Sequence, residues 1–189
     1  MAPPWAYYAE REIAAQKDYP QVMGEFIWTG FDYLGEPTPY YTNWPSRSSY
    51  FGVVDLAGLP KNRYYLYRSV WTDIPTLHIF PHWNFENKIG EVVPVHIYTN
   101  YDEVELFVNG KSQGKRTFAQ KKAEFKDKMD EWQNQVERFR LIWNDVVYEP
   151  GEITAVAYKD GKEAERKTIK TAGEPYAIRL SAYSDKITA

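Results

Sequence analysis

The fold of this chain is predicted by one stretch, Gly24-Glu25-Phe26-Ile27-Trp28-Thr29-Gly30-Phe31-Asp32-Tyr33-Leu34-Gly35-Glu36-Pro37. Its first half places apolar and β-favouring residues between two glycines, which predicts a short buried strand. Its second half is a turn-rich loop with aromatic residues, carboxylates and Glu36-Pro37. A buried strand that leads into such a loop is how α/β enzymes present a sugar site. The alternative is that the aromatic strand end forms only core and rim.

The flanking segments complete a single β/α unit. Residues 5–17 have weak helical periodicity that ends before Pro20, because proline disfavours helix in the residue before it. Residues 33–49 form a long loop without a periodic pattern, which is typical of a binding loop. Residues 61–71 are compatible with a second helix. One such unit, residues 1–73, cannot close a barrel or a doubly wound sheet.

Beyond residue 74 the pattern changes to short alternating segments. They are separated by the turn signals Asn109-Gly110, Pro150-Gly151 and Asp160-Gly161. The predicted strands are 77–80, 92–98, 104–108, 139–143, 153–158 and 164–169. This pattern predicts an immunoglobulin-like β-sandwich over residues 74–172, and a chain that is mainly β.

A helix is predicted to interrupt the sandwich at about residues 117–137. Apolar residues recur there at helical spacing, with lysine and glutamate on the other faces; they are Phe118, Phe125, Met129, Trp132 and Val136. This amphipathic helix either folds back onto the sandwich or binds a partner. Residues 173–189 are predicted to be a linker and the start of a further β domain.

Composition excludes some classes of function. The net charge is −3 over 189 residues, so there is no basic surface to attract nucleic acid. No apolar run approaches the roughly 20 residues needed to cross a bilayer, so we expect no membrane partner. The chain has no cysteine, which excludes disulfides and thiolate metal sites. Aromatic residues make up 17% of the chain, which favours carbohydrate binding or interface formation without choosing between them.

The carboxylates near the aromatic loop do not form a convincing catalytic pair. Hydrolysis of a glycosidic bond needs an acid together with a nucleophile or base, and the candidates by position are Glu25, Asp32, Glu36 and Asp55. None of their spacings predicts such a pair, so no catalytic residue is assigned. The histidines His78 and His82 would lie about 13 Å apart on an extended strand, too far for one metal ion. We therefore expect neither a metal nor another cofactor.

Several motifs resemble bacterial β-galactosidases of glycoside hydrolase family 2. They are Gly-Glu-Phe-Ile-Trp-Thr-Gly-Phe-Asp-Tyr-Leu-Gly-Glu-Pro-Thr-Pro-Tyr (24–40), Ser-Arg-Ser-Ser-Tyr-Phe-Gly-Val-Val-Asp-Leu-Ala-Gly (46–58), Phe-Pro-His-Trp-Asn-Phe (80–85), Val-Glu-Leu-Phe-Val-Asn-Gly-Lys-Ser (104–112) and Asp-Val-Val-Tyr-Glu-Pro-Gly-Glu (145–152). The resemblance implies that residues 1–73 are the last β/α unit of a (β/α)8 TIM barrel. The sandwich would be the first domain after that barrel.

The resemblance also implies a function. Enzymes of this family cleave their substrate with retention, using two glutamates that are expected upstream of Met1 and match no residue here. The chain would then be an inactive part of a β-galactosidase whose partner is a β-galactoside or oligosaccharide. For the full-length bacterial enzyme the resemblance suggests a periplasmic or extracellular location.

Four residues are predicted to bind substrate by this resemblance. Trp28 resembles the tryptophan of the eighth barrel strand that lines the subsite of the cleaved sugar, and Glu25 and Asp32 match supporting acidic positions. Arg47 is either a donor to substrate or a structural arginine that holds the loop. β-Glucuronidases of the family have an Asn-x-Lys clamp where this chain has Ser49-Tyr50-Phe51, so a neutral sugar is expected.

Other functions remain open on the sequence alone. The sandwich could bind glycan through surface aromatic residues such as Trp83, or it could be a purely structural spacer. An isolated barrel strand leaves hydrogen-bonding edges and apolar faces uncovered. Residues 1–73 are therefore expected to be stabilised by self-association, by packing on the sandwich or by upstream chain.

Overall fold

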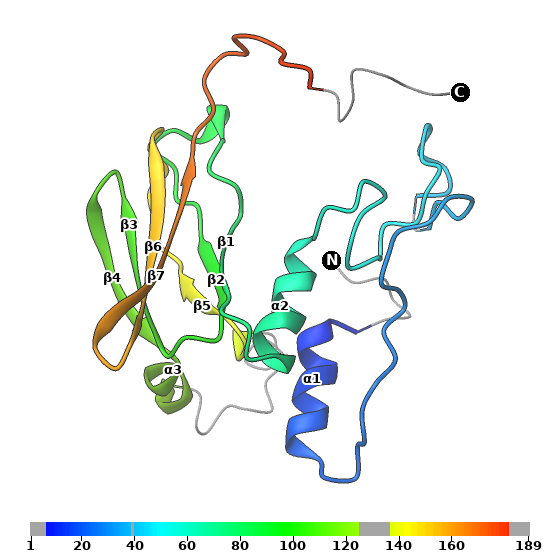
Figure 1. Cartoon of the computed structure of the whole chain (residues 1–189), viewed down its shortest axis with the longest axis horizontal. Helices are drawn as coiled ribbons and strands as arrows, with labels where there is room; N and C mark the ends of the chain where they lie inside the picture. The colour runs from blue at the N-terminus through cyan, green and yellow to red at the C-terminus, as the bar shows by residue number, and fades with distance from the viewer. Residues whose placement is uncertain (1–6, 39, 125–136, 182–189) are drawn as a thin grey trace.

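The computed structural model describes residues 7–38, 40–124 and 137–181. In these residues two antiparallel sheets pack face to face beside a pair of helices (Figure 1). The strands are β1 (Leu77–Phe80), β2 (Val95–Thr99), β3 (Glu103–Val108), β4 (Lys111–Thr117), β5 (Leu141–Trp143), β6 (Glu152–Lys159) and β7 (Lys162–Lys170). The helices are α1 (Ala9–Asp18), α2 (Asn62–Trp71), α3 (Phe118–Glu124) and the 3-10 turn η1 (Glu86–Lys88).

The sandwich consists of a three-stranded sheet in the order β1-β2-β5 and a four-stranded sheet in the order β4-β3-β6-β7. In β3 the alternation of apolar and charged residues explains which side chains are buried. The valines and Leu106 face the core, and Glu103 and Glu105 face outward. Trp83 and Trp143 are fully buried between the sheets, where their Nε1 atoms donate to the carbonyls of Glu149 and Gly114. The prediction of a mainly β sandwich is confirmed.

Tight turns join the strands at Asn109-Gly110 and Asp160-Gly161, as predicted. All four residues have positive φ. Asn109 has a second role. Its Oδ1 accepts from the Glu152 amide at 2.8 Å, and its Nδ2 donates to the Pro150 carbonyl at 3.2 Å and to Glu149 Oε2 at 3.5 Å. The side chain therefore links the β3–β4 turn to the start of β6.

Helix α3 begins at a capping box. Thr117 Oγ1 accepts from the Gln120 amide at 3.0 Å, and Gln120 Oε1 accepts from the Thr117 amide at 3.2 Å. The helix lies where an inserted helix was predicted, and residues 125–136 of that prediction lie outside the described part. Strand β4 was not predicted because its residues are mostly exposed at a sheet edge and carry no apolar alternation.

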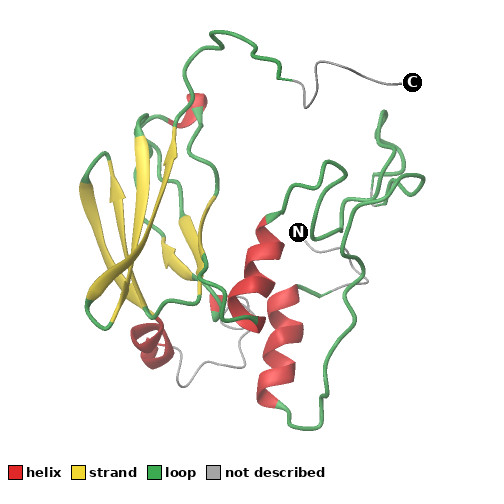
Figure 2. Ribbon diagram, viewed as in Figure 1, coloured by secondary structure: helices red, strands yellow, loops and turns green. Residues whose placement is uncertain are grey.

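Helices α1 and α2 pack against each other and against the sandwich. Their core contains Ile13, Leu66 and Tyr67, together with Tyr98 of β2. Between the helices the chain runs as loops on the side away from the sandwich (Figure 2). Beyond β7, residues 173–181 are extended and exposed, with Tyr176, Ile178 and Leu180 each more than 90% accessible.

The predicted buried strand at residues 24–30 is wrong for this chain. Residues 24–29 are irregular, and Phe26 and Trp28 are 106% and 74% exposed. A barrel strand is hydrogen-bonded along two edges, but residues 29–32 contact one neighbouring segment, through Val53 N to Thr29 O at 3.0 Å and Asp32 N to Val54 O at 2.9 Å. This one-sided pairing leaves the stretch extended but not buried.

Candidate functional site

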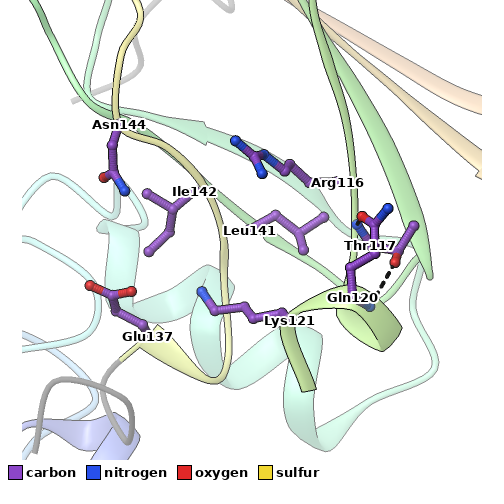
Figure 3. A pocket seen from close by; sticks show the side chains of 8 residues that line it. All are labelled: Arg116, Thr117, Gln120, Lys121, Glu137, Leu141, Ile142 and Asn144. Atoms are coloured by element: carbon purple, nitrogen blue, oxygen red, sulfur yellow. Dashed lines mark hydrogen bonds between the residues drawn. The ribbon is translucent and has the colours of Figure 1, made fainter. Parts of the chain in front are cut away.

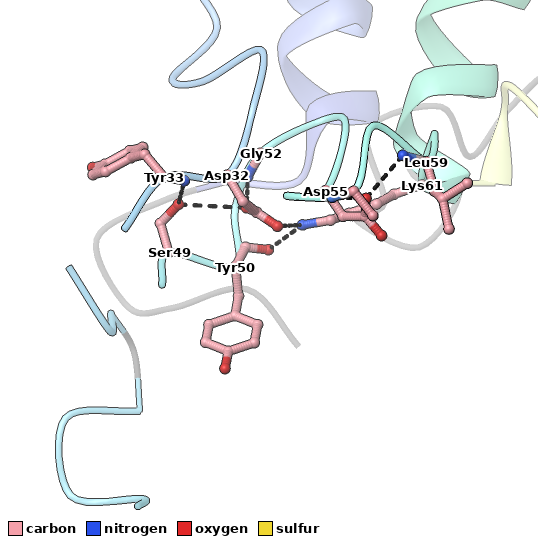
Figure 4. Close-up of polar contacts among 9 residues, drawn as sticks. Asp32, Tyr33, Ser49, Tyr50, Gly52, Asp55, Leu59 and Lys61 are labelled. Atoms are coloured by element: carbon pink, nitrogen blue, oxygen red, sulfur yellow. Dashed lines mark hydrogen bonds and ion pairs between the residues drawn. The ribbon is translucent and has the colours of Figure 1, made fainter. Parts of the chain in front are cut away.

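The site is built on a buried carboxylate at Asp32, which is 9% exposed. Its Oδ1 accepts from the Gly52 amide at 2.8 Å and from Ser49 Oγ at 3.4 Å (Figure 4). Its Oδ2 forms an ion pair with Lys61 Nζ at 2.5 Å, and Lys61 also donates to the Tyr50 carbonyl at 3.0 Å. Asp32 therefore ties the 31–33 segment to the loop that returns at 49–61.

Backbone pairing and a close approach complete this junction. The Tyr33 amide donates to Ser49 Oγ at 3.1 Å, and the Ser49 amide donates to the Tyr33 carbonyl at 2.9 Å. A Cβ at Gly52 would lie 2.3 Å from the Asp32 nitrogen and 2.5 Å from the Phe31 carbonyl carbon. Only glycine allows the two segments to approach this closely.

Trp28 lies at the exposed end of a chain of polar contacts. Its Nε1 donates to Tyr33 Oη at 3.3 Å, Tyr33 Oη donates to Glu36 Oε2, and Thr38 Oγ1 donates to Glu36 Oε1 at 2.9 Å. The Trp28 and Tyr33 rings meet edge to face with centroids 6.4 Å apart. The indole is thus held by its nitrogen while 74% of the residue's surface stays accessible, as a stacking platform requires. The Trp28–Thr29 peptide bond is cis.

The same hydrogen bonds shift the pKa values of Tyr33 and Glu36. The hydrogen bond from Tyr33, and next that from Thr38, lowers the pKa of Glu36. The same bond to Glu36 raises the pKa of Tyr33. Glu36 is therefore an anionic acceptor at neutral pH, and Tyr33 is a protonated donor.

Arg47 is placed in the same loop but against a different aromatic residue. Its guanidinium carbon lies 4.5 Å from the ring centroid of Trp44, which is 80% exposed. Its carbonyl accepts from the Gly35 amide at 3.0 Å, so the backbone of Arg47 helps to hold the turn at Gly35. Both roles predicted for Arg47 are compatible with this position.

Glu25 contacts α1 and not the Trp28 group. Its side chain lies beside Gln16 of α1, and burial, followed by the nearby charge of Glu12, raises the pKa of its carboxyl group. Its Oε1 is buried without a hydrogen-bond partner among the described residues. Of the four predicted residues, Trp28 and Asp32 are joined through Tyr33, Arg47 lies in the adjoining loop, and Glu25 faces the helix.

Sequence reasoning did not identify the roles of Tyr33, Ser49 and Lys61. Tyr33 and Glu36 are three residues apart within a turn, a spacing that could have suggested their contact. Ser49 and Lys61 lie 17 and 29 residues from Asp32, and no periodic pattern connects positions so far apart.

The described residues contain no group of three or more His, Asp or Glu side chains able to hold a metal ion. No described helix has the length and apolar character needed to cross a membrane.

Known proteins resemble nearly the whole chain. A family model described as "Domain of unknown function (DUF4982)" matches residues 90–165. The β-galactosidase BoGH2A of Bacteroides ovatus is 44% identical over 187 residues, which are 98% of this chain and 20% of that protein.

Solved structures also match nearly the whole chain. A β-glycosidase from Bacteroides vulgatus matches with a TM-score of 0.72 and 38% identity, over 93% of this chain and 20% of that one. A glycosyl hydrolase family 2 member from Bacteroides cellulosilyticus matches with a TM-score of 0.68 and 30% identity, over 90% of this chain and 24% of that one. Proteins named β-glucuronidase, from Formosa agariphila and Parabacteroides merdae, are also among the matches.

These matches confirm the resemblance to glycoside hydrolase family 2: nearly all of this chain is homologous to a segment of its glycosidases. The chain spans about a fifth of the length of the relatives that it matches.

Proposed function

We propose that this chain is part of a retaining β-galactosidase, in which it positions the sugar while other parts of the protein supply the two reacting carboxyl groups. The observation that carries the proposal is the exposed indole of Trp28, whose nitrogen donates to Tyr33 Oη, which in turn donates to Glu36. A flat apolar face with one fixed edge suits stacking on a pyranose ring. The sandwich serves as scaffold for this loop.

The carboxylates around Trp28 support a positioning role. A retaining glycosidase needs two carboxyl groups about 5–5.5 Å apart, one of them free to attack the sugar. Asp32 is occupied by Gly52 and Lys61, and Glu36 accepts from Tyr33 and Thr38. Asp32 and Glu36 each already have a structural partner, so hydrolysis is expected to depend on residues that this chain does not contain.

The cations of the loop support a neutral sugar. A uronic acid would need a free cation to bind its carboxylate. Lys61 is held between Asp32 and the Tyr50 carbonyl, and the guanidinium of Arg47 lies over Trp44. Ser49, at the predicted position of the β-glucuronidase clamp, is fully buried against Asp32.

The test is a chimera in which residues 1–189 replace the matching segment of the Bacteroides ovatus β-galactosidase. We expect the chimera to hydrolyse a nitrophenyl β-galactoside, and this chain alone to be inactive. Trp28→Ala should lower kcat/KM of the chimera about 100-fold, because a misplaced substrate loses that much. A nitrophenyl β-glucuronide should be a poor substrate.

The matched control is Trp44→Ala, which removes an equally large exposed indole from the same loop. It removes no predicted sugar contact and only the exposed cation–π contact with Arg47, so kcat/KM should stay within about fivefold of the parent. Turnover by the isolated chain would contradict the absence of catalytic carboxyl groups. Equal losses in both tryptophan variants would contradict the role of Trp28.

The alternative of a glycan-binding sandwich loses its candidate residue. Trp83 is 0% exposed and packs edge to face with Tyr148 inside the core. The prediction of Trp83 as a surface aromatic is therefore wrong. Its proline-flanked motif places the ring between the sheets, where burial of the indole stabilises the sandwich. A structural role for the sandwich is compatible with the proposal above.

A further inference from the structure

The chain leaves the sandwich after β4 and returns at β5, and the two ends of this excursion, residues 118–140, belong to different cores. Phe118, at its start, packs against the core between the two sheets. Phe139, near its end, is buried in the helix-pair core with Ile13 and Leu66. The described parts of the excursion, 118–124 and 137–140, therefore connect the sandwich with the helix pair.

A buried ion pair fixes the first turn of α1 to the end of the excursion. Glu10 is 4% exposed, and its Oε1 accepts from Arg140 Nη2 and from Tyr98 Oη, the latter at 2.7 Å. The Arg140 guanidinium carbon also lies 5.3 Å from the Tyr98 ring centroid. Burial, followed by the Glu10 charge, raises the pKa of Tyr98, so its hydroxyl remains a donor. A buried charge of this kind depends on each of its partners.

A second ion pair holds the last residue of the same helix. Arg138 Nη1 donates to both carboxylate oxygens of Asp18, at 2.9 and 2.7 Å. Lys121 Nζ of α3 donates to the Arg140 carbonyl at 2.7 Å, which joins the two ends of the excursion. Glu10 and Asp18 are about 12 Å apart along the helix axis. Attachment at two points so far apart fixes the orientation of α1 as well as its position.

Two pockets lie beside these polar contacts. A cavity of about 290 Å³ lies between α3 and the strand that enters β5 (Figure 3). It is lined by Arg116, Thr117, Gln120, Lys121, Glu137, Leu141, Ile142 and Asn144. A second cavity, of about 260 Å³, lies where Lys17, Val70 and Arg138 approach Tyr101. Lys121 lines the first pocket and Arg138 the second, and each makes a directed polar contact there.

Helix α1 also contacts the segment that carries Trp28. Ile27, the residue before Trp28, packs against the helix-pair core that contains Ile13 and Ala14 of α1. We propose that residues 137–140 are a brace that ties α1 to the sandwich through Arg138 and Arg140, and thereby positions the segment that carries Trp28. Its effect on activity rests on the function proposed above. The attachment of α1 to the sandwich does not depend on that function.

The attachment is tested by hydrogen exchange on the 189-residue chain. Arg140→Met leaves the Glu10 charge buried with one partner fewer, so amides in α1 should exchange at least about tenfold faster. Amides of β3 and β6 should keep their protection. Adding Glu10→Gln removes the stranded charge and should recover part of the lost protection. Unchanged exchange in α1, or equal loss in α1 and the sandwich, would overturn the brace.

A milder variant covers the case in which Arg140→Met does not fold. Tyr98→Phe removes one hydroxyl that donates to Glu10, and should accelerate exchange in α1 by about fivefold with the sandwich unchanged. The control is Arg166→Ala, whose pair with Glu163 is exposed on β7 and should alter neither region. An α1 that exchanges at the parent rate in Tyr98→Phe would also overturn the brace.

Positioning of Trp28 is tested in the chimera. Arg140→Met should lower kcat/KM about tenfold through both a higher KM and a lower kcat, with partial rescue by Glu10→Gln, because the loop is displaced and its groups remain intact. Arg166→Ala should have no effect. If amides of α1 exchange faster in the Arg140→Met chimera while kcat and KM are unchanged, the brace does not position Trp28. An inactive parent chimera would refute the proposed function and leave the exchange result to decide the brace.

Discussion

The two halves of the molecule use tryptophan in opposite ways. In the sandwich Trp83 and Trp143 are 0% exposed, and each donates its Nε1–H to a backbone carbonyl. In the loop between α1 and α2, Trp28 and Trp44 are 74% and 80% exposed and contact Tyr33 and Arg47. The same side chain is buried in one region and exposed to solvent in the other, so its surroundings and not its identity decide its role.

The comparison extends to apolar residues in general. The sandwich buries its apolar side chains around one core. The segment between α1 and α2 exposes most of its large ones, which are Tyr19, Met23, Phe26, Trp28, Phe31, Leu34, Tyr40, Tyr41, Trp44, Tyr50, Leu56 and Leu59. A surface of this kind marks an interface or a binding site. We therefore expect substitutions to affect stability in the sandwich and function in the loop.

The largest expected effect is that of Trp83→Ala. Removing a fully buried indole leaves a cavity and should lower the free energy of unfolding by about 3–5 kcal/mol. Trp44→Ala, at an exposed position, should change it by less than about 0.5 kcal/mol. Urea unfolding of both variants measures the difference. Similar losses in the two variants would break the contrast between the halves.

The second prediction concerns pH and the helix-facing side of the sandwich. Burial, followed by the charge of Lys167, lowers the pKa of His78 from 6.5 to about 4. Burial, followed by Arg140, lowers that of His96 equally, from 6.5 to about 4. As the pH falls from 6.5 to about 4, the unfolded chain binds these protons first, so stability falls through this window and the loss is complete below it.

The loss should reach at most about 3 kcal/mol for each of these two histidines. A double variant with His78→Gln and His96→Gln should show a smaller decrease over the same pH range in urea unfolding. His82→Gln, at an exposed ring, should keep the parent decrease. A parent protein equally stable at both ends of this window would contradict the prediction.

A third prediction addresses the close approach beneath the Trp28 loop. Gly52→Ala would place a methyl group 2.3 Å from the Asp32 nitrogen, and the forced displacement should cost about 1–3 kcal/mol in local stability. The readout is exchange of the Asp32 amide, which donates to the Val54 carbonyl. Gly30→Ala, in the same loop with nothing within 4 Å of the added carbon, is the control. Equal effects of the two changes would show that the loop does not depend on this contact.

The smallest effect is expected from Asp32→Asn. Asparagine keeps an acceptor for the Gly52 amide but loses the ion pair with Lys61, whose side chain is 31% exposed. Solvent screening limits the loss to about 1 kcal/mol of local stability, read from exchange of the Gly52 amide. Added salt should weaken the parent more than the variant. An accelerated exchange that is the same at all salt concentrations would point to lost shape and not to lost charge.

The strands could be predicted where burial is decided locally. Alternation marks β3, because this strand has one face on a core that the chain itself provides. The turns at Asn109 and Asp160 are marked by the glycine that follows each residue. Strand β4 carries no such signal at the sheet edge. Residues 24–30 carry an apolar signal without burial, since one neighbouring segment alone pairs with them.

The site was predictable in part. The family motif predicts Trp28 and Asp32 as site residues, but it does not predict the contacts that hold them. Ser49 and Lys61 reach Asp32 across long loops, and such contacts depend on the path of the backbone rather than on any spacing in the sequence. The brace was missed for the same reason, because Arg140 and Glu10 are 130 residues apart.

The hairpin at Asn109-Gly110 has a consequence for how the protein ages. Asn-Gly sequences lose ammonia when the glycine amide nitrogen attacks the asparagine side-chain carbonyl. Here that side chain is already held by the Glu152 amide and the Pro150 carbonyl. We expect the folded protein to deamidate at Asn109 far more slowly than a peptide of residues 104–114, as followed by mass spectrometry during storage. Once deamidated to aspartate, residue 109 would present a carboxylate to Glu149 and lose the bond that it donates to the Pro150 carbonyl, while it keeps an acceptor for the Glu152 amide.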